Sequence, residues 1–284
     1  CGPGAPPPPV VEPLYEYPPA APVDGLPVGS GFRVIYMDAQ IVVVEKASGL
    51  LSVPGVSPSA QDCLLSRVGH HVPGVRIVHR LDRDTSGVMV LARDAESHRI
   101  LSVAFERREV GKEYLAVGEG WCDEEALQGK EGVRCPGAGT GGAAAAASWG
   151  QIDLPIGKDL QRKGVAVASM RKMRVDFEGR LSRTMWRVLG RLDNPPGERT
   201  IFHLKPHTGR THQLRVHLAM GLGHPIVGDE IYAPPAVADK SRNMRGIGRA
   251  NRLCLHAWRL SFNHPETGSK VAFESAAPFA PDAG

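Results

Sequence analysis

The chain carries the sequence HRLDRDTSG at residues 79–87, followed directly by VMVLAR at residues 88–93. The second run is apolar and contains two valines, which predicts a buried strand. The preceding GVRIV, at residues 74–78, alternates at a period near two and predicts a short strand. The loop between them holds two carboxylates, two cations, a histidine and two hydroxyls. A loop of this kind is either a solvated turn or a site held on a rigid scaffold.

A second stretch, KPHTGRTHQLRVHL at residues 205–218, favours a site. Together the two stretches resemble the RluA-type pseudouridine synthases, which are marked by HRLDxxTSG early and by TGRxHQ(I/L)RxH late. The resemblance continues in GHPIVGD at residues 223–229 and in RLCLHA at residues 252–257. It covers roughly residues 31–275, and the sequence after Lys46 is similar to the family's KPxGL except that Ala47 replaces proline. Four ordered motifs are far more specific than a single glycine pattern.

The periodicity predicts many strands and few helices. Strands are expected at residues 34–37, 41–46, 112–117, 151–156, 184–192, 200–204, 254–262 and 271–273, besides those already named. One helix is expected to be capped by Asp94 and to end near Arg108, and another to be capped by Thr211 and to run through Leu218. This pattern predicts an α+β domain on a largely antiparallel sheet. The resemblance implies the pseudouridine synthase fold, a mixed sheet with a central catalytic cleft.

Composition suggests three regions. Residues 1–30 are rich in proline and predict a disordered leader, and residues 31–284 are expected to form one catalytic domain. Residues 119–148 include low-complexity Gly and Ala runs and predict a surface insertion. The first residue is cysteine, so we expect the true N-terminus to be missing. The five cysteines include no C-x-x-C pair, which favours a reducing compartment over a disulfide framework or a zinc site.

The location is less constrained by sequence. No apolar run approaches 18 residues, so we expect no membrane span. A proline-rich leader and an Ala/Gly-rich insertion are more usual in eukaryotic proteins, which leaves a chloroplast or mitochondrion open as the compartment.

Basic residues gather in two blocks, although the formal net charge is only +4. Residues 158–191 hold ten Lys or Arg, and residues 240–252 hold five with no acid, among them Arg242, Arg245 and Arg249. Each block alone is equally consistent with a solvated face. Beside a base-modifying motif, the two blocks favour a polyanionic partner, and we expect these three arginines to bind RNA.

The resemblance assigns Asp82 as the nucleophile. A carboxylate is anionic at neutral pH and can add covalently and then leave. Whether it attacks uracil C6 or ribose C1′ stays open, as does the simpler interpretation of Asp82 as a turn cap. Asp84 is the rival carboxylate, at a position where the family varies.

Two further catalytic residues follow from the resemblance. Arg215 matches the family arginine that pairs with the aspartate, and an exposed helix arginine is the alternative. Tyr114 matches the tyrosine that stacks on the target base, and a core tyrosine is the alternative. RNA-binding roles are expected for His79 and Arg80, which should also hold the loop, and for Arg210 and His212. Arg80 is further expected to help fill the space of the displaced base.

No metal or cofactor is expected. The histidines of residues 203–217 alternate with cations and have no carboxylate or thiol beside them, which argues against a metal site. The sequence therefore predicts a monomeric, RluA-type RNA pseudouridine synthase acting on tRNA or rRNA. The rival is a catalytically silent RNA-binding or RNA-folding protein on the same scaffold.

Overall fold

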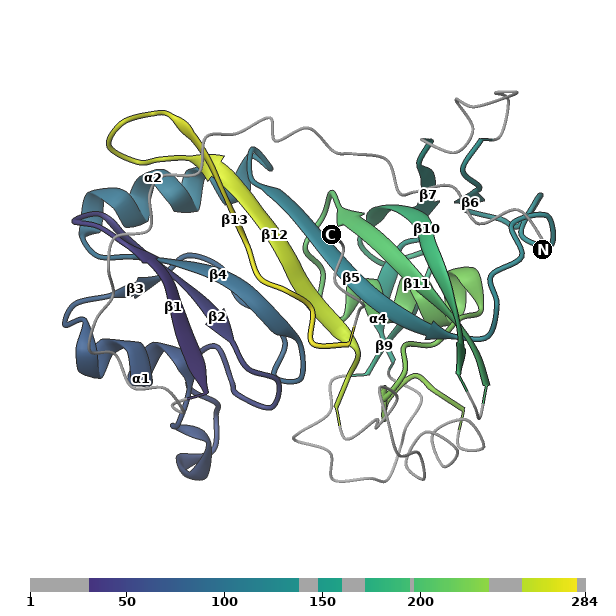
Figure 1. The fold of residues 1–284 in the computed structure, drawn as a ribbon, viewed down its shortest axis with the longest axis horizontal. Coiled ribbons are helices and arrows are strands. Elements are labelled where there is room, and N and C mark those ends of the chain that lie inside the picture. The colour runs from purple at the N-terminus through teal and green to yellow at the C-terminus, as the bar shows by residue number, and fades with distance from the viewer. Residues whose placement is uncertain (1–30, 138–147, 160–171, 195–196, 235–251, 280–284) are drawn as a thin grey trace, which may run out of the picture.

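The computed structural model describes residues 31–137, 148–159, 172–194, 197–234 and 252–279 (Figure 1). The predicted leader, and the predicted RNA-binding residues Arg242, Arg245 and Arg249, lie outside these ranges. Within the described residues, no helix has the length and apolar character needed to cross a membrane.

The elements lie in chain order as follows. The first half contains β1 (Phe32–Met37), β2 (Ile41–Lys46), a 3₁₀ turn (Pro58–Ala60), α1 (Leu64–His71), β3 (Arg76–Ile77), β4 (Ser86–Ala92), α2 (Ala95–Glu106) and β5 (Gly111–Glu119). The second half contains β6 (Val133–Arg134), β7 (Gly150–Asp153), β8 (Ile156–Lys158), β9 (Met173–Val175), β10 (Arg183–Asn194), β11 (Gly197–Pro206), α4 (Gln213–Val216), a π-helical turn (His217–Leu222), β12 (Leu255–Asn263) and β13 (Lys270–Glu274).

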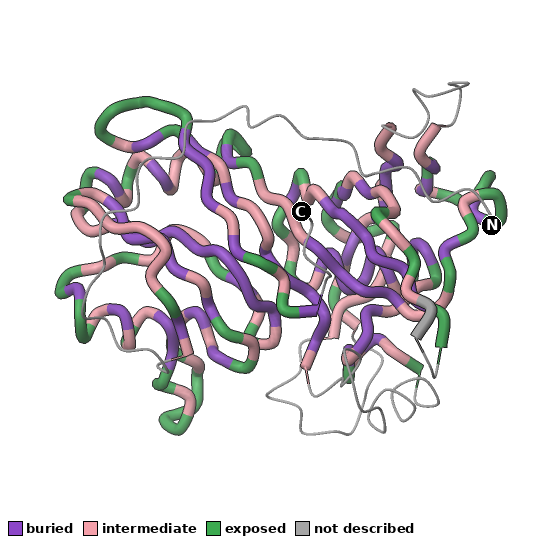
Figure 2. Tube along the Cα trace, in the orientation of Figure 1, coloured by how far each residue is buried: buried purple, intermediate pink, exposed green. Residues whose placement is uncertain are grey.

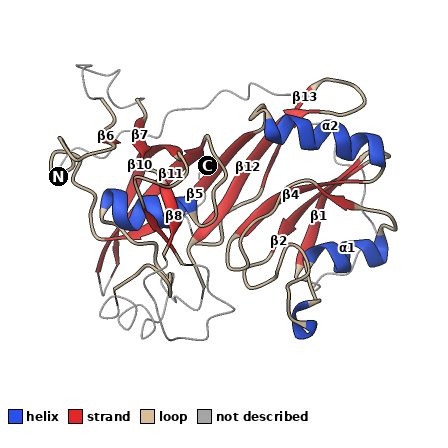
Figure 3. Cartoon of the chain, turned by 180° about the vertical axis from the view of Figure 1, so that it is seen from behind, coloured by secondary structure: helices blue, strands red, loops and turns tan. Residues whose placement is uncertain are grey.

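One 11-stranded sheet runs through the described part of the molecule, in the order β1-β2-β4-β12-β5-β11-β10-β7-β6 (Figures 1 and 3). β13 pairs with β12, β3 pairs with β4, and β8 and β9 form a separate pair. Among the described strand pairs only β4 and β12 run parallel. The predicted α+β class and mixed, largely antiparallel sheet are therefore confirmed.

The first half of the sheet is covered by helices on both faces. Alternate residues of a strand point to opposite faces. Accordingly, Val42 and Val44 pack with α1, whereas Ile41 and Val43 pack with Leu101 of α2. Burial on both faces explains why β2 and β4 are continuous apolar runs rather than alternating ones. Figure 2 shows the buried residues following these strands.

The second half has its own core behind the cleft. Trp186 and Phe202 of the sheet pack with Leu214 and Leu218 from α4 and the π-helical turn. The predicted helix at this place exists but begins later than expected. Its N-cap is His212, in the left-handed conformation at φ 56°, and Thr211 is not its cap.

The structure narrows the predicted insertion. Cys122, Leu127, Val133 and Cys135 are each at most 8% exposed and pack in the core of the second half. Residues 133–134 form β6, which pairs with β7. Much of the stretch from 122 to 135 therefore contributes to the core and the sheet of the second half rather than to a surface insertion. Residues 138–147, which hold the Gly and Ala runs, lie outside the described residues.

The two halves meet where β4 runs beside β12. The paired residues are Ser86 with His256 and Gly87 with Ala257. Gly87 has φ 116°, and a Cβ there would lie 2.2 Å from the Ala257 carbonyl oxygen, so only glycine fits. The Ser86 hydroxyl lies 2.8 Å from Nδ1 of His256. The TSG motif at residues 85–87 and the LHA motif at residues 255–257 thus join β4 to β12, next to the loop that carries Asp82.

Candidate active site

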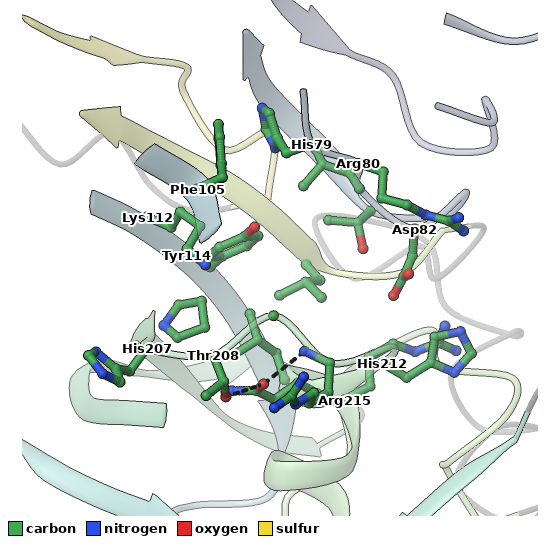
Figure 4. Close-up of a pocket in the computed structure, with 18 of the residues that line it drawn as sticks. His79, Arg80, Asp82, Phe105, Lys112, Tyr114, His207, Thr208, His212 and Arg215 are labelled. Atoms are coloured by element: carbon green, nitrogen blue, oxygen red, sulfur yellow. Dashed lines mark hydrogen bonds between the residues drawn. The ribbon is translucent and has the colours of Figure 1, made fainter. Parts of the chain in front are cut away.

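A single cavity of about 440 Å³ brings the two sequence motifs together. Its lining includes all seven predicted site residues that the structure describes: His79, Arg80, Asp82, Tyr114, Arg210, His212 and Arg215. One wall comes from the loop before β4, and the other from the turn between β11 and α4 (Figure 4). The volume falls within the range of small-ligand sites.

The Asp82 loop is held from outside the cavity by the stretch that follows β2. The Lys46 ammonium is fully buried and donates to the Arg83 carbonyl at 2.9 Å, and to the carbonyls of Ala47 and Leu50. The Ser52 hydroxyl donates to the Leu81 carbonyl at 2.7 Å. Backbone groups on both sides of Asp82 are therefore fixed, while its carboxylate lies in the cavity wall.

His79 anchors the start of the same loop. Its ring stacks on Phe105 with centroids 4.5 Å apart, and Nε2 accepts the Val90 N–H at 3.1 Å. Burial, together with the nearby Lys112 charge, lowers the pKa of His79 to about 3. His79 is therefore a neutral imidazole that holds the loop and presents no cation to RNA.

The opposite wall is organised by Gln213. Its Oε1 accepts from the Thr208 hydroxyl at 2.7 Å and from the Arg210 N–H at 3.1 Å. Its Nε2 donates to the Arg183 carbonyl and the Thr184 hydroxyl. One buried amide thus ties the turn between β11 and α4 to β10, which gives the glutamine of the motif a structural role.

Arg215 has a different partner from the one expected. Its Nε and terminal nitrogen donate to the two oxygens of Asp229 at 2.8 and 2.7 Å, and both side chains are at most 4% exposed. The described residues give Arg215 no hydrogen bond to Asp82. Burial works against the Arg215 charge, but Asp229 and, more weakly, Asp82 raise its pKa. The expected ion pair with Asp82 is thus replaced by one with Asp229, while Asp82 still lies within electrostatic reach.

Asp229 is itself preorganised for this pairing. Its Oδ1 also accepts the backbone N–H groups of Ile231 and Tyr232, at 2.9 and 3.0 Å. The Tyr232 ring lies under the Arg215 guanidinium at 5.2 Å, and its hydroxyl forms a 2.8 Å hydrogen bond with Nδ1 of His212. Arg215 is therefore fixed on two sides before any substrate arrives.

Tyr114 lies in the middle of the sheet between the two walls. It is paired with Leu204 of β11 and Ala257 of β12, so its ring projects from β5 into the cavity. Burial, reinforced by the Asp82 charge, raises the pKa of its phenol. Tyr114 is therefore protonated and neutral at physiological pH.

The histidines that invited a metal interpretation have other partners. His217 is bonded to Thr184 and to the Leu154 carbonyl, and burial lowers its pKa to about 4. His203 lies 2.6 Å from Glu113 on the face of the sheet away from the cleft. Within the described ranges, no group of His, Cys, Asp and Glu is arranged to hold a metal ion.

Sequence reasoning missed the residues that support the site, namely Lys46, Ser52, Asp229 and Tyr232. A signal existed for three of them. Lys46 begins the stretch similar to KPxGL, Ser52 lies just beyond it, and Asp229 ends GHPIVGD. The resemblance marked these places without giving them partners, which only the fold supplies.

Comparison with known proteins agrees with this geometry. A family model described as RNA pseudouridylate synthase matches residues 40–220. The chain is 36% identical to the dual-specificity RNA pseudouridine synthase RluA of Yersinia pestis over 247 residues, which is 87% of this chain and 99% of that protein. It is 34% identical to the protein of the same name from Haemophilus influenzae, over 94% of this chain and 99% of that one.

The fold comparison points the same way. The structure of human RNA pseudouridylate synthase domain containing 1 aligns with a TM-score of 0.62 at 24% identity, covering 92% of this chain and 89% of that one. Motif order, the gathered cavity and the extent of these matches lead to one conclusion. The chain belongs to the RNA pseudouridylate synthase family, of the RluA type.

Proposed function

We propose that the protein isomerises specific uridines of structured RNA to pseudouridine, with Asp82 as the nucleophile. The observation that carries the proposal is the cavity itself. Asp82, Tyr114 and Arg215 come from three separate parts of the chain and line one space of about 440 Å³. An RNA-binding protein without chemistry has no need to place a carboxylate beside a buried, preorganised arginine.

The reaction requires the N1–C1′ bond to break and a C5–C1′ bond to form. The proton at C5 is lost, and N1 gains one, so no oxidant or cofactor enters the balance. A uridine flipped out of the RNA would lie against the Tyr114 ring. The Asp82 carboxylate would add covalently to the nucleoside and leave again, at C6 or C1′. Arg215 keeps a positive charge near that carboxylate throughout.

Charged residues that line the cavity away from the reacting atoms are candidates for contacts with the RNA. We assign Arg80 and Arg210 to the RNA backbone, since both line the cavity and carry charge. His212 lies beside Asp82 and Arg215, and burial lowers its pKa, so it contributes a neutral polar contact. Arg242, Arg245 and Arg249 are proposed as further backbone contacts on the strength of the sequence alone.

The relatives are named dual-specificity enzymes. We therefore propose both tRNA and rRNA as substrates. The test uses transcripts of each class labelled with tritium at uracil C5, since isomerisation releases that atom. Tritium release, with pseudouridine found by mass spectrometry at one defined position, is the expected result. RNA binding without release from any transcript would instead identify the catalytically silent RNA-binding protein.

We further propose that the enzyme acts as a monomer. One chain supplies Asp82, Tyr114 and Arg215 to the cavity, so the proposed chemistry requires no residue from a second subunit. Light scattering of the purified protein during active turnover should give a mass close to 30.5 kDa.

A fluorescent fusion of the complete coding sequence, imaged with mitochondrial and chloroplast markers, tests the organelle interpretation.

A further inference from the structure

The cavity has a second charged end, away from Asp82. Figure 4 shows Lys112 and His207 at one end and Asp82 and His212 at the other, with Tyr114 and Arg215 between them. Arg108 and Glu106 also line the cavity. The reaction described above uses the Asp82 end, and it assigns nothing to Lys112 and Arg108.

Lys112 reaches across the cleft towards the opposite wall. A Cβ placed on Gly209, in the opposite wall, would lie 4.0 Å from the Lys112 ammonium nitrogen. Burial, reinforced by the Arg108 charge, lowers the pKa of Lys112. In the described part of the chain no carboxylate forms an ion pair with it. A desolvated cation that faces a second cation is stabilised by an anion.

Arg108 occupies a backbone position that normally selects glycine. It follows the C-terminus of α2 at φ 61°, with its N–H donating to the Phe105 carbonyl and the next N–H donating to the Ala104 carbonyl at 2.9 Å. This is the usual left-handed ending of a helix, where glycine avoids the steric cost of a Cβ. Arginine at this position leaves the backbone strained. Strain of this kind is found mainly at functional sites, where the side chain has a role of its own.

We propose that Lys112 and Arg108, with His207 on the opposite wall, form a phosphate subsite that holds the RNA backbone beside the flipped uridine. The inference rests on the proposed function, because the RNA reaches this end when a uridine lies at Asp82. Lys112 is desolvated and has the Arg108 charge beside it, so a formal anion stabilises this end of the cavity. In RNA that group is the phosphate rather than a base carbonyl. Glu106, which lines the cavity at this end, is exposed and pairs with neither cation within the described ranges.

The test replaces phosphates one at a time. Synthetic stem-loops are made from the shortest RNA that the wild-type protein modifies, each with one charge-free methylphosphonate linkage near the target uridine. For the wild type, one linkage should weaken binding about tenfold, the expected loss for a hydrogen bond to a charged group. For Lys112→Met the same linkage should have a much smaller effect, because one of the partners of that phosphate is already absent.

Arg108→Gly separates the subsite from a structural role. The variant relieves the left-handed strain, so its resistance to urea should match or exceed that of the wild type. Its RNA affinity should nevertheless fall, and the slope of log affinity against log salt should decrease by about 0.7 to 0.9. Lys112→Arg should restore most of the affinity lost in Lys112→Met. Lys205→Met is the matched control, since Lys205 pairs with Glu113 on the other face of the sheet.

Distinct outcomes bear on the two proposals. If the wild type is active and the effect of the methylphosphonate linkage is undiminished in Lys112→Met, the subsite is overturned and the proposed function is left intact. The same holds if Lys112→Met weakens binding while no single linkage matters, because the contact would then be to a base. A wild type that releases no tritium from any RNA would contradict the function on which the subsite rests.

Discussion

The Arg215 guanidinium and the Asp229 carboxylate form a buried ion pair with two hydrogen bonds, of 2.7 and 2.8 Å, and almost no exposure to water. Both charges are held by the protein before RNA binds. Since a buried charge without its partner is costly, the pair has consequences for stability as well as for catalysis.

Arg215→Met and Asp229→Asn should each lower the free energy of unfolding by about 3–5 kcal/mol, because each leaves the other group buried without its ionic partner. Both variants should also be severely impaired in catalysis. Urea denaturation and tritium release measure the two effects. Arg183→Met is the control, since its ion pair with Asp153 is exposed and should contribute less than about 1 kcal/mol. A loss in Arg215→Met no larger than in this control would contradict the role assigned to the pair.

Lys46 predicts a dependence of stability on pH. Burial lowers its pKa to about 7, although Asp84 and Asp82 oppose the shift. The unfolded chain keeps this proton to about pH 10, so it binds more protons than the folded protein between these values. The free energy of unfolding should therefore rise with pH above about 7, by at most about 1.4 kcal/mol per unit.

The comparison for this prediction is Lys46→Met, which has no such group. The difference in the free energy of unfolding between wild type and variant should shift in favour of the wild type as pH rises from about 6.5 to 9. A difference that stays constant across this range would show that Lys46 titrates normally in the folded protein.

At the scale of elements, residues 119–137 carry part of the second core. Leu127 is 6% exposed and packs in that core beside Val133. Leu127→Ala should lower the free energy of unfolding by about 2–5 kcal/mol, the usual loss for a buried leucine. Replacing residues 138–147 with a short Gly/Ser linker should change it by less than about 1 kcal/mol, since loop-closure entropy varies slowly with length. The opposite ranking of these two variants would contradict this boundary.

The elements that sequence predicted well are those with local signals. The sequence predicted β1, β2 and the helix capped by Asp94 within a few residues. The apolar periodicity and the helix cap depend only on residues close together in the chain. α1 was missed. It buries only Leu64 and Val68, and its cap is Cys63, a residue type that does not normally mark a helix start. Its position is set by packing against β2 and β4 instead.

The start of α4 shows a different kind of failure. Thr211 is a better cap by residue type than His212, yet the structure uses His212 in a left-handed conformation. The turn before the helix is fixed by Gln213, which binds Thr208 and the Arg210 N–H. Gln213 is in turn held by its bonds to the Arg183 carbonyl and the Thr184 hydroxyl, about 30 residues away. These non-local contacts override a local preference, and no propensity argument contains that information.

For the whole molecule, the resemblance named in advance seven residues that the structure gathers in one cavity. Periodicity alone could not place Asp82, Tyr114 and Arg215 in one cavity, since this depends on the order of strands in the sheet. The partner of Arg215 could not be predicted either. Asp82 and Asp229 are both carboxylates in motif regions, and only the path of the chain after the π-helical turn brings Asp229 to the guanidinium.

The basic block at residues 240–252 is expected to bind the RNA backbone outside the cavity. Replacing Arg242, Arg245 and Arg249 with glutamine should weaken RNA binding and flatten its salt dependence, with single-turnover chemistry at saturating RNA little changed. The expected decrease in slope is roughly 0.7 for each phosphate contact to single-stranded RNA. Affinity measured over a range of salt concentrations provides the test. An unchanged slope would place this block away from the RNA.

The most direct test of the account is pseudouridine formation by Asp82→Asn, compared with Asp84→Asn. Asparagine keeps the size of the side chain but removes the anion, so no covalent step can begin. Asp82→Asn should fold, bind RNA with near wild-type affinity, and release no detectable tritium from C5-labelled RNA. Asp84→Asn should remain active, since Asp84 pairs with Arg83 and does not line the cavity. Pseudouridine made by Asp82→Asn at a rate near that of the wild type would contradict the mechanism proposed for this site.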